Sequence, residues 1–265
     1  MTEAAPLLEA RQLRCGYDGQ EILHGLSLTV RPHEKLCILG PNGCGKTTLL
    51  RALAGMLPLT DGRVLVRGAD GPLDVRHAPR RAVARCLALM SQQPSLAFSY
   101  TVYETVQLGR FAHRQGLLSG PDAADRAAVE ESLRRTGLWQ LRSRPITALS
   151  GGQLQRVFLA RTLAQQPRII LLDEPTSHLD LKYQLELTEY LREWAAEEEH
   201  CVVGVLHDLN LALRFADTLL LLKDGRMMAQ GPAAGFDLTA LDALFGLDVG
   251  GYMRGALARW QQRAD

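Results

Sequence analysis

The sequence lacks a surplus of charge of either sign, and this absence argues against one class of partner. Its 265 residues include 30 Lys and Arg against 29 Asp and Glu. A protein dedicated to nucleic acid normally carries a basic surplus, because it must neutralise backbone phosphates. We therefore expect no nucleic-acid partner for this chain.

Cysteine is scarce and scattered. The five cysteines stand singly, and no two of them form a C-x-x-C pair. Closely spaced cysteines are what a structural zinc site or a disulfide framework needs. The pattern argues against both, and a reducing cytosol is the expected compartment.

Long apolar runs are also missing. A helix that crosses a membrane needs about 20 apolar residues, whereas the cluster at 219–222 is flanked by Asp217 and Lys223. The first ten residues carry Glu3 and Glu9 and no basic segment of the kind that begins a signal peptide. We expect neither a membrane span nor a signal peptide, although the 46% of apolar residues can build a sizeable core.

A glycine-rich loop follows an expected buried strand at 35–39. It fits the pattern G-x-x-x-x-G-K-[ST], and helical spacing follows at 48–54, ended by Gly55. Its glycines let successive N–H groups point at one anion, and the helix N-terminus adds partial positive charge. The predicted nucleoside triphosphate site consists of Gly40, Pro41, Asn42, Gly43, Cys44, Gly45, Lys46, Thr47 and Thr48.

Side chains in and beyond this loop suit magnesium-dependent chemistry. Lys46 can reach the outer phosphates, and the Thr47 hydroxyl can ligate Mg²⁺. A second apolar run, at 168–172, ends in Asp173 and Glu174. Asp173 would supply the carboxylate that magnesium needs beside a phosphate loop. Glu174 would polarise a water molecule against the terminal phosphate.

Strand-like and helix-like runs alternate along the chain, which favours an α/β fold. No long helix separates the expected strands at 7–15, 26–30 and 63–67, so they predict an antiparallel sheet beside the nucleotide. Another strand is expected at 87–90, before a mostly helical stretch at 95–165. After it, we expect a helix at 179–199, strands at 201–206 and 218–222 with a helix at 209–216 between them, and a hairpin at Asp224-Gly225.

A second glycine-containing helix start stands at 150–153, shortly before Asp173. A serine followed by two glycines is most simply a helix cap, but such an end also binds anions. Together with the phosphate loop, it favours two chains that share nucleotides across an interface. The residues concerned are Ser150, Gly151, Gly152 and Gln153.

In this order, the motifs resemble those of the ATP-binding subunits of ABC transporters, over residues 7–249. The loop matches Walker A, 149–153 the signature and 169–174 Walker B. Four single residues match family positions: Gln92 as the Q-loop glutamine (with Gln93 as the competing interpretation), Asp180 in the D-loop, His207 as the switch histidine and Tyr17 as the aromatic residue that stacks on adenine.

The resemblance implies the fold of an ABC-type phosphate-loop NTPase. This fold has a mixed-sheet core, an antiparallel β subdomain and an inserted helical subdomain at about 95–165. The ATP-binding domain would span 7–249 and be followed by a short tail at 250–265. For that tail, a solvated helix covering the sheet edge is favoured over contact with a membrane or a partner.

The resemblance also implies a mechanism in which two copies enclose two ATP molecules. Lys46 and the loop amides would hold the phosphates, while Glu174 and His207 would act on the attacking water. The implied Mg²⁺ ligands are Thr47, Gln92 and Asp173. The signature of the opposite chain would cap the terminal phosphate, and Asp180 would link the two sites.

The segments 177–181 and 206–212 are most similar to those of importer ATPases for iron–siderophore, haem or cobalamin. A homodimer, integral-membrane permease subunits and a periplasmic or lipoprotein binding protein are then expected, with the chain at the cytoplasmic face of the membrane. Phe98, Tyr100 and Val102 are candidates for the groove that receives the permease, with the core of the helical lobe as an equal alternative. A metal-ion importer, a soluble ABC ATPase, for example in iron–sulfur assembly, and, less favoured, an exporter half are compatible with the same motifs.

Overall fold

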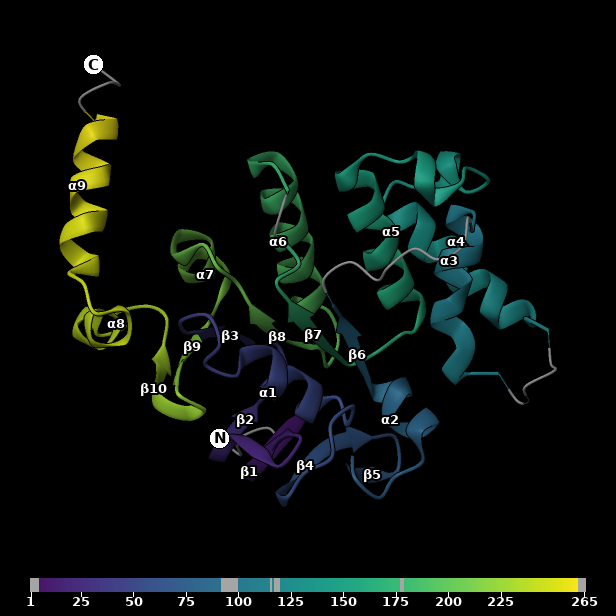
Figure 1. The fold of residues 1–265 in the computed structure, drawn as a ribbon. Coiled ribbons are helices and arrows are strands. Elements are labelled where there is room, and N and C mark those ends of the chain that lie inside the picture. The colour runs from purple at the N-terminus through teal and green to yellow at the C-terminus, as the bar shows by residue number, and fades with distance from the viewer. Residues whose placement is uncertain (1–4, 92–99, 115, 117–119, 177–178, 262–265) are drawn as a thin grey trace.

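The computed structural model describes residues 5–91, 100–114, 116, 120–176 and 179–261. Two sheets and several helical layers make up this part of the chain, with the antiparallel sheet at the bottom of Figure 1 and the parallel strands above it. Among the described residues, no helix is both long and apolar enough to cross a membrane.

The first sheet has the strand order β2-β1-β4-β5 and is antiparallel throughout. Asp18 and Gly19, both with positive φ, form the tight turn between its first two strands, because a two-residue hairpin of this kind requires left-handed backbone. This sheet confirms the predicted antiparallel subdomain. Its strands are β1 (Leu8–Tyr17), β2 (Gln20–Val30), β4 (Asp61–Gly68) and β5 (Gly71–Asp74).

The second sheet has the order β10-β9-β3-β8-β7-β6, with β10 antiparallel at one edge and the remaining strands parallel. Its central strands are buried on both faces, which explains their continuous apolar runs. The strands are β3 (Lys35–Leu39), β6 (Leu87–Met90), β7 (Ile169–Asp173), β8 (Cys201–Val205), β9 (Thr218–Lys223) and β10 (Arg226–Pro232).

Helices cover both faces of the parallel sheet. Leu49, Leu50 and Leu53 of α1 fill the core between the two sheets, and residues of α6, α7 and α8 form a second core with the parallel strands. The helices are α1 (Lys46–Leu53), α2 (Arg80–Cys86), α3 (Val102–Gln107), α4 (Ala123–Arg135), α5 (Gly151–Ala164), α6 (Leu181–Ala196), α7 (Leu209–Phe215), α8 (Leu238–Phe245) and α9 (Val249–Gln261).

Helices α3, α4 and α5 pack around a third core of their own. Val102 is fully buried in it, whereas Tyr100 is exposed; Phe98 lies outside the described residues. A buried ion pair, Arg110 Nε to Asp125 Oδ1 at 2.8 Å, fixes the start of α4 to the segment after α3. The inserted helical region is thus confirmed as part of the fold, while its limits at about 95 and 165 stay a prediction.

The structure corrects several sequence-based expectations. Helix α2 was not predicted, because its arginine-rich sequence buries only Val83 and Cys86. The helix expected at 179–199 is shorter than predicted, because α6 begins at Leu181 and ends at Ala196. Helix α9 contacts α8 and extends away from both sheets in Figure 1, while Val249 in its first turn is buried in the second core.

Candidate nucleotide-binding site

The glycine-rich loop joins the end of β3 to the start of α1. Gly45 caps α1 with φ 105°, in the left-handed region, and provides no side-chain hydrogen bond to the helix. A Cβ at Gly40 would lie 2.2 Å from the Leu222 carbonyl oxygen and 2.6 Å from Cys44 Sγ. Glycine is therefore required for the loop to pack against the end of β9. Because Gly45 supplies no side-chain cap, the N-terminus of α1 is suited to an anionic ligand.

Lys46 lies within this loop. Its side chain is buried, and its Nζ donates hydrogen bonds to the carbonyl oxygens of Gly40, at 2.8 Å, and Pro41, at 2.9 Å. The loop carbonyls thereby hold a positive charge at the helix end, where it adds to the dipole of α1.

A cavity of about 260 Å³ opens on the loop. Glu174, which follows β7, lies in its wall beside residues of the loop and of the first turn of α1. Ile22 of β2 also lies in the wall and was not predicted, because nothing in a sheet residue's local sequence signals contact with a ligand. The residues lining the cavity are Ile22, Asn42, Gly43, Gly45, Lys46, Thr47, Thr48 and Glu174.

Thr47 and Asp173 meet beside the cavity. The Thr47 hydroxyl donates to Asp173 Oδ1 at 3.0 Å. Burial raises the pKa of Asp173, although the hydrogen bond from Thr47 opposes the shift. A buried carboxylate beside a hydroxyl is a hard oxygen donor set that suits Mg²⁺. Among the described residues, no group of three or more His, Cys, Asp or Glu could hold a metal, so further ligands would have to come from elsewhere, such as a nucleotide or water.

Glu174 and His207 come together from neighbouring strands. Glu174 follows β7 and His207 follows β8, and the two side chains approach to 2.5 Å between Oε1 and Nε2. Glu174 has φ 52°, an unusual value for a residue with a side chain, while its N–H donates to the Val205 carbonyl oxygen at 3.2 Å. Such backbone conformations cost about 1–3 kcal/mol and cluster at functional sites.

Tyr17 stands at the end of β1 and is 38% exposed. Its hydroxyl accepts a hydrogen bond from Arg51 of α1 at 3.4 Å. It lies near the loop helix without lining the cavity itself. The contact with Arg51 was not predicted, since it depends on how β1 packs against α1.

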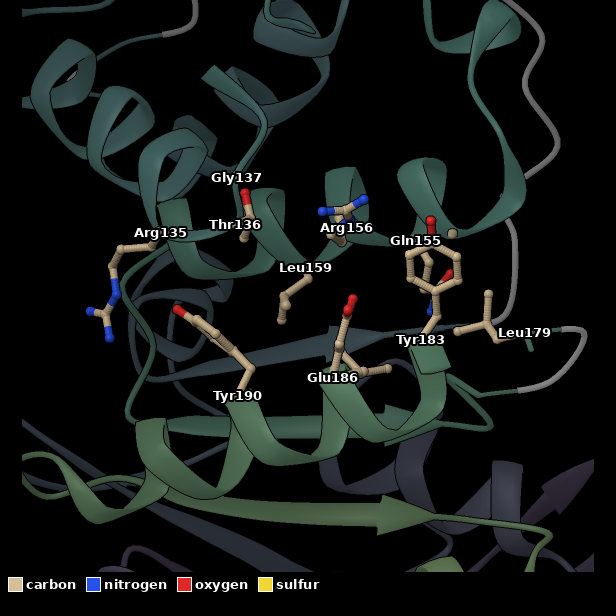
Figure 2. Close-up of a pocket in the computed structure, with 12 residues that line it drawn as sticks. Arg135, Thr136, Gly137, Gln155, Arg156, Leu159, Leu179, Tyr183, Glu186 and Tyr190 are labelled. Atoms are coloured by element: carbon tan, nitrogen blue, oxygen red, sulfur yellow. The ribbon is translucent and has the colours of Figure 1, made fainter. Parts of the chain in front are cut away.

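The expected signature residues lie elsewhere on the chain. Ser150 caps α5 through a reciprocal pair of hydrogen bonds with Gln153, and Asp180 caps α6 by accepting from the Tyr183 N–H. Neither lines the cavity. Gly152 instead lines a second pocket, of about 330 Å³, between α5 and α6 (Figure 2).

One contact connects the signature helix with the carboxylate segment. Gln155 of α5 donates through Nε2 to the Pro175 carbonyl oxygen at 2.7 Å. This link follows from tertiary packing and has no local sequence signal. Gln92 and Gln93, expected at the Q-loop, lie outside the described residues.

Fold and loop geometry define a phosphate-loop nucleotide-binding protein, and comparison with known proteins narrows the class. The family model for the ABC transporter matches residues 23–177. An achromobactin transport ATP-binding protein, CbrD from Dickeya dadantii, is 39% identical over 91% of this chain and 88% of its own length. A hemin import ATP-binding protein, HmuV from Streptomyces coelicolor, is 44% identical over 86% of this chain and 80% of its own length.

A solved structure agrees with these relatives. A chain of an ABC transporter in an inward-facing conformation superposes with a TM-score of 0.78 and 29% identity, over 91% of this chain and 89% of that one. Some curated relatives are longer, and the chain spans about half (54%) of an ABC transporter ATP-binding protein from Bacillus subtilis. The chain belongs to the ABC transporter family, as an ATP-binding cassette of the kind that hydrolyses ATP.

Proposed function

We propose that this chain hydrolyses ATP to energise an importer, as one of two identical ATP-binding subunits. The observation that carries the proposal is the meeting of four side chains at the carboxyl ends of β7 and β8 and the start of α1. These side chains belong to Thr47, Asp173, Glu174 and His207. They lie beside a buried lysine and a helix end suited to phosphate.

In this proposal, catalysis is mainly positioning and charge stabilisation. Lys46 and the N–H groups of the loop bind the outer phosphates. Glu174 accepts a proton from the attacking water, and His207 orients that water and contacts the terminal phosphate. Thr47 and Asp173, with Gln92, would hold Mg²⁺, which neutralises charge on the phosphates when bound. Tyr17 stacks on the adenine.

The signature residues act on the nucleotide of the partner chain. Their place outside the cavity of their own chain supports this part of the proposal. Ser150, Gly151, Gly152 and Gln153 would cap the terminal phosphate held by the partner, and Asp180 would connect the two sites. Hydrolysis then requires the two chains to close on each other.

We further propose that the cargo is an iron–siderophore, haem or cobalamin. The names of two relatives, achromobactin transport and hemin import, support this group. The partners would be separate membrane-embedded permease subunits and a substrate-binding protein, with this chain at the cytoplasmic face. A metal-ion importer or a soluble ABC ATPase in iron–sulfur assembly are the competing functions.

Purification of the tagged chain from native membranes solubilised in mild detergent tests the transport role. Mass spectrometry would identify the bound proteins, with the untagged chain as the control. We expect a multi-span permease in stoichiometric amount, and its identity would indicate the cargo. Recovery of only water-soluble partners would contradict transport and favour the cytosolic ATPase.

A further inference from the structure

Tyr183 touches both motifs that are expected to act on the partner's nucleotide. It lies in the first turn of α6, and its N–H donates to Asp180 Oδ1 at 3.1 Å, closing the cap of that helix. Its side chain points from α6 toward α5 (Figure 2). The residue is therefore tied to the D-loop aspartate through its backbone and to the signature helix through its ring.

The ring of Tyr183 fits against α5 only because residue 152 is a glycine. A Cβ at Gly152 would lie 2.7 Å from two atoms of the ring, closer than real Cβ atoms approach other atoms. The guanidinium of Arg156, one turn further along α5, lies over the same ring with its Cζ 5.5 Å from the ring centre. The ring thus lies against the backbone of the first turn of α5, beneath Arg156.

A second contact fixes the same turn of α5. Gln155 donates to the carbonyl oxygen of Pro175, which directly follows Glu174. Two contacts therefore fix the start of α5, one through Gln155 to Pro175, next to Glu174, and one through Tyr183, whose N–H is bonded to Asp180. Side chains that share packing and hydrogen bonds in this way are energetically coupled.

We propose that Tyr183 is a positioning residue for ATP hydrolysis, which holds the signature turn and Asp180 at a fixed spacing. This inference rests on the proposed function, since Ser150, Gly152 and Asp180 act across the dimer only if that function is right. Tyr183 itself does not line the cavity beside the phosphate loop. It acts through the backbone of Gly152 and the carboxylate of Asp180, so that a closing partner meets both motifs in register.

Three variants separate positioning from general packing. Tyr183→Leu removes the ring, and Tyr183→Phe keeps it. Tyr190→Leu is the matched control, because Tyr190 lines the same pocket two turns further along α6, where Arg135 and not Arg156 lies over its ring. Each would be measured for kcat, KM, ATP affinity of the isolated chain and melting temperature. ATP-induced dimer formation would be measured in the Glu174→Gln background, which we expect to remain closed.

Tyr183→Leu should lower kcat and weaken the ATP-bound dimer by roughly tenfold each, since small misplacements of positioned groups cost this much or more. The ATP affinity of the isolated chain should stay unchanged, and the melting temperature should match that of Tyr190→Leu. Tyr183→Phe should restore the dimer and most of kcat. Equal kcat and dimer affinity for Tyr183→Leu and Tyr190→Leu would overturn the positioning role of Tyr183 and would leave the proposed function unaffected. If Glu174→Gln with native Tyr183 forms no dimer with ATP, the proposed function fails, and this inference fails with it.

Discussion

The starts of α1 and α5, the two helix ends that we propose bind phosphate, are built in opposite ways. At the start of α1, the cap residue is Gly45, which makes no side-chain hydrogen bond to the helix, and Lys46 is buried. At the start of α5, the Ser150 hydroxyl accepts from the Gln153 N–H, and Ser150 itself is exposed. One end leaves its amides to a ligand, and the other is capped by its own chain and presented at the surface.

This difference has a physical reason. A helix end inside the core needs a partner for its unpaired N–H groups, because burying them unsatisfied is costly. A helix end at the surface can be capped by serine and remain stable before any partner arrives. We interpret the start of α1 as the site that binds the nucleotide of its own chain. The start of α5 is then the site that binds the nucleotide of a second chain.

The largest effect on catalysis is expected beside the start of α1, at the carboxylate of Glu174. Glu174→Gln should leave ATP binding intact, because the loop and Lys46 are untouched, and should lower kcat by roughly 100-fold or more. Steady-state phosphate release and ATP titration would measure the two effects separately. Turnover at the native rate would contradict the catalytic role of Glu174.

Removing the buried charge at α1 tests the same end through binding. Lys46→Ala should weaken ATP binding by roughly tenfold or more, because a charged hydrogen-bond donor to phosphate is lost. Lys182→Ala, an exposed lysine at the start of α6, is the control and should bind ATP as the native chain does. Isothermal titration calorimetry would compare the ATP affinities of the two variants. Equal affinities would argue against the loop as the phosphate site.

The α5 end is tested by its cap. Ser150→Ala should destabilise the fold by about 1 kcal/mol and weaken the ATP-bound dimer, while leaving the ATP affinity of a single chain unchanged. Asp122→Ala removes the equivalent cap of α4, so it should cost similar stability without affecting the dimer. Denaturant unfolding and size-exclusion chromatography would check both. If both variants weakened the dimer equally, the effect of Ser150→Ala would follow from lost helix stability, and the proposed role of the α5 end in the dimer would be contradicted.

The smallest effect concerns the cysteine within the loop. Cys44 is buried, and burial raises the pKa of its thiol, with Lys46 partly opposing the shift. Because its pKa is raised, less thiolate is present at pH 7.5 than in a free thiol, and the reactive fraction grows only as the pH rises. Iodoacetamide should therefore label Cys44 slowly in the folded chain and more slowly still with ATP. Labelling as fast as in the urea-unfolded chain would contradict the buried placement of the loop.

Much of the fold follows from local patterns. The strands predicted at 35–39 and 87–90 match β3 and β6 to the residue, since each is a short apolar run buried in a parallel sheet. Strand β5 was missed because it is short and contains glycine and proline. Helix α2 was missed because it is short and rich in arginine, and its two buried residues, Val83 and Cys86, are too few to show a helical period in the sequence.

The candidate site likewise contains some residues that the sequence could predict and others that it could not. The phosphate loop, Asp173 and Glu174 could be named from the sequence, because their chemistry follows directly from neighbouring residues. Ile22, Arg51, Gln155 and Tyr183 could not be named, because each reaches its contact from an element distant in sequence.

The sequence by itself determined which chemical groups are present and in what order, since a glycine loop, a strand ending in two carboxylates and a serine–glycine helix start are all local patterns. Only the tertiary structure decided which of them meet. Parallel pairing of β7 with β8 brings Glu174 to 2.5 Å from His207, and the packing of α6 against α5 brings Tyr183 onto Gly152. Distances of this kind depend on strand order and helix packing, which join residues that no local pattern connects.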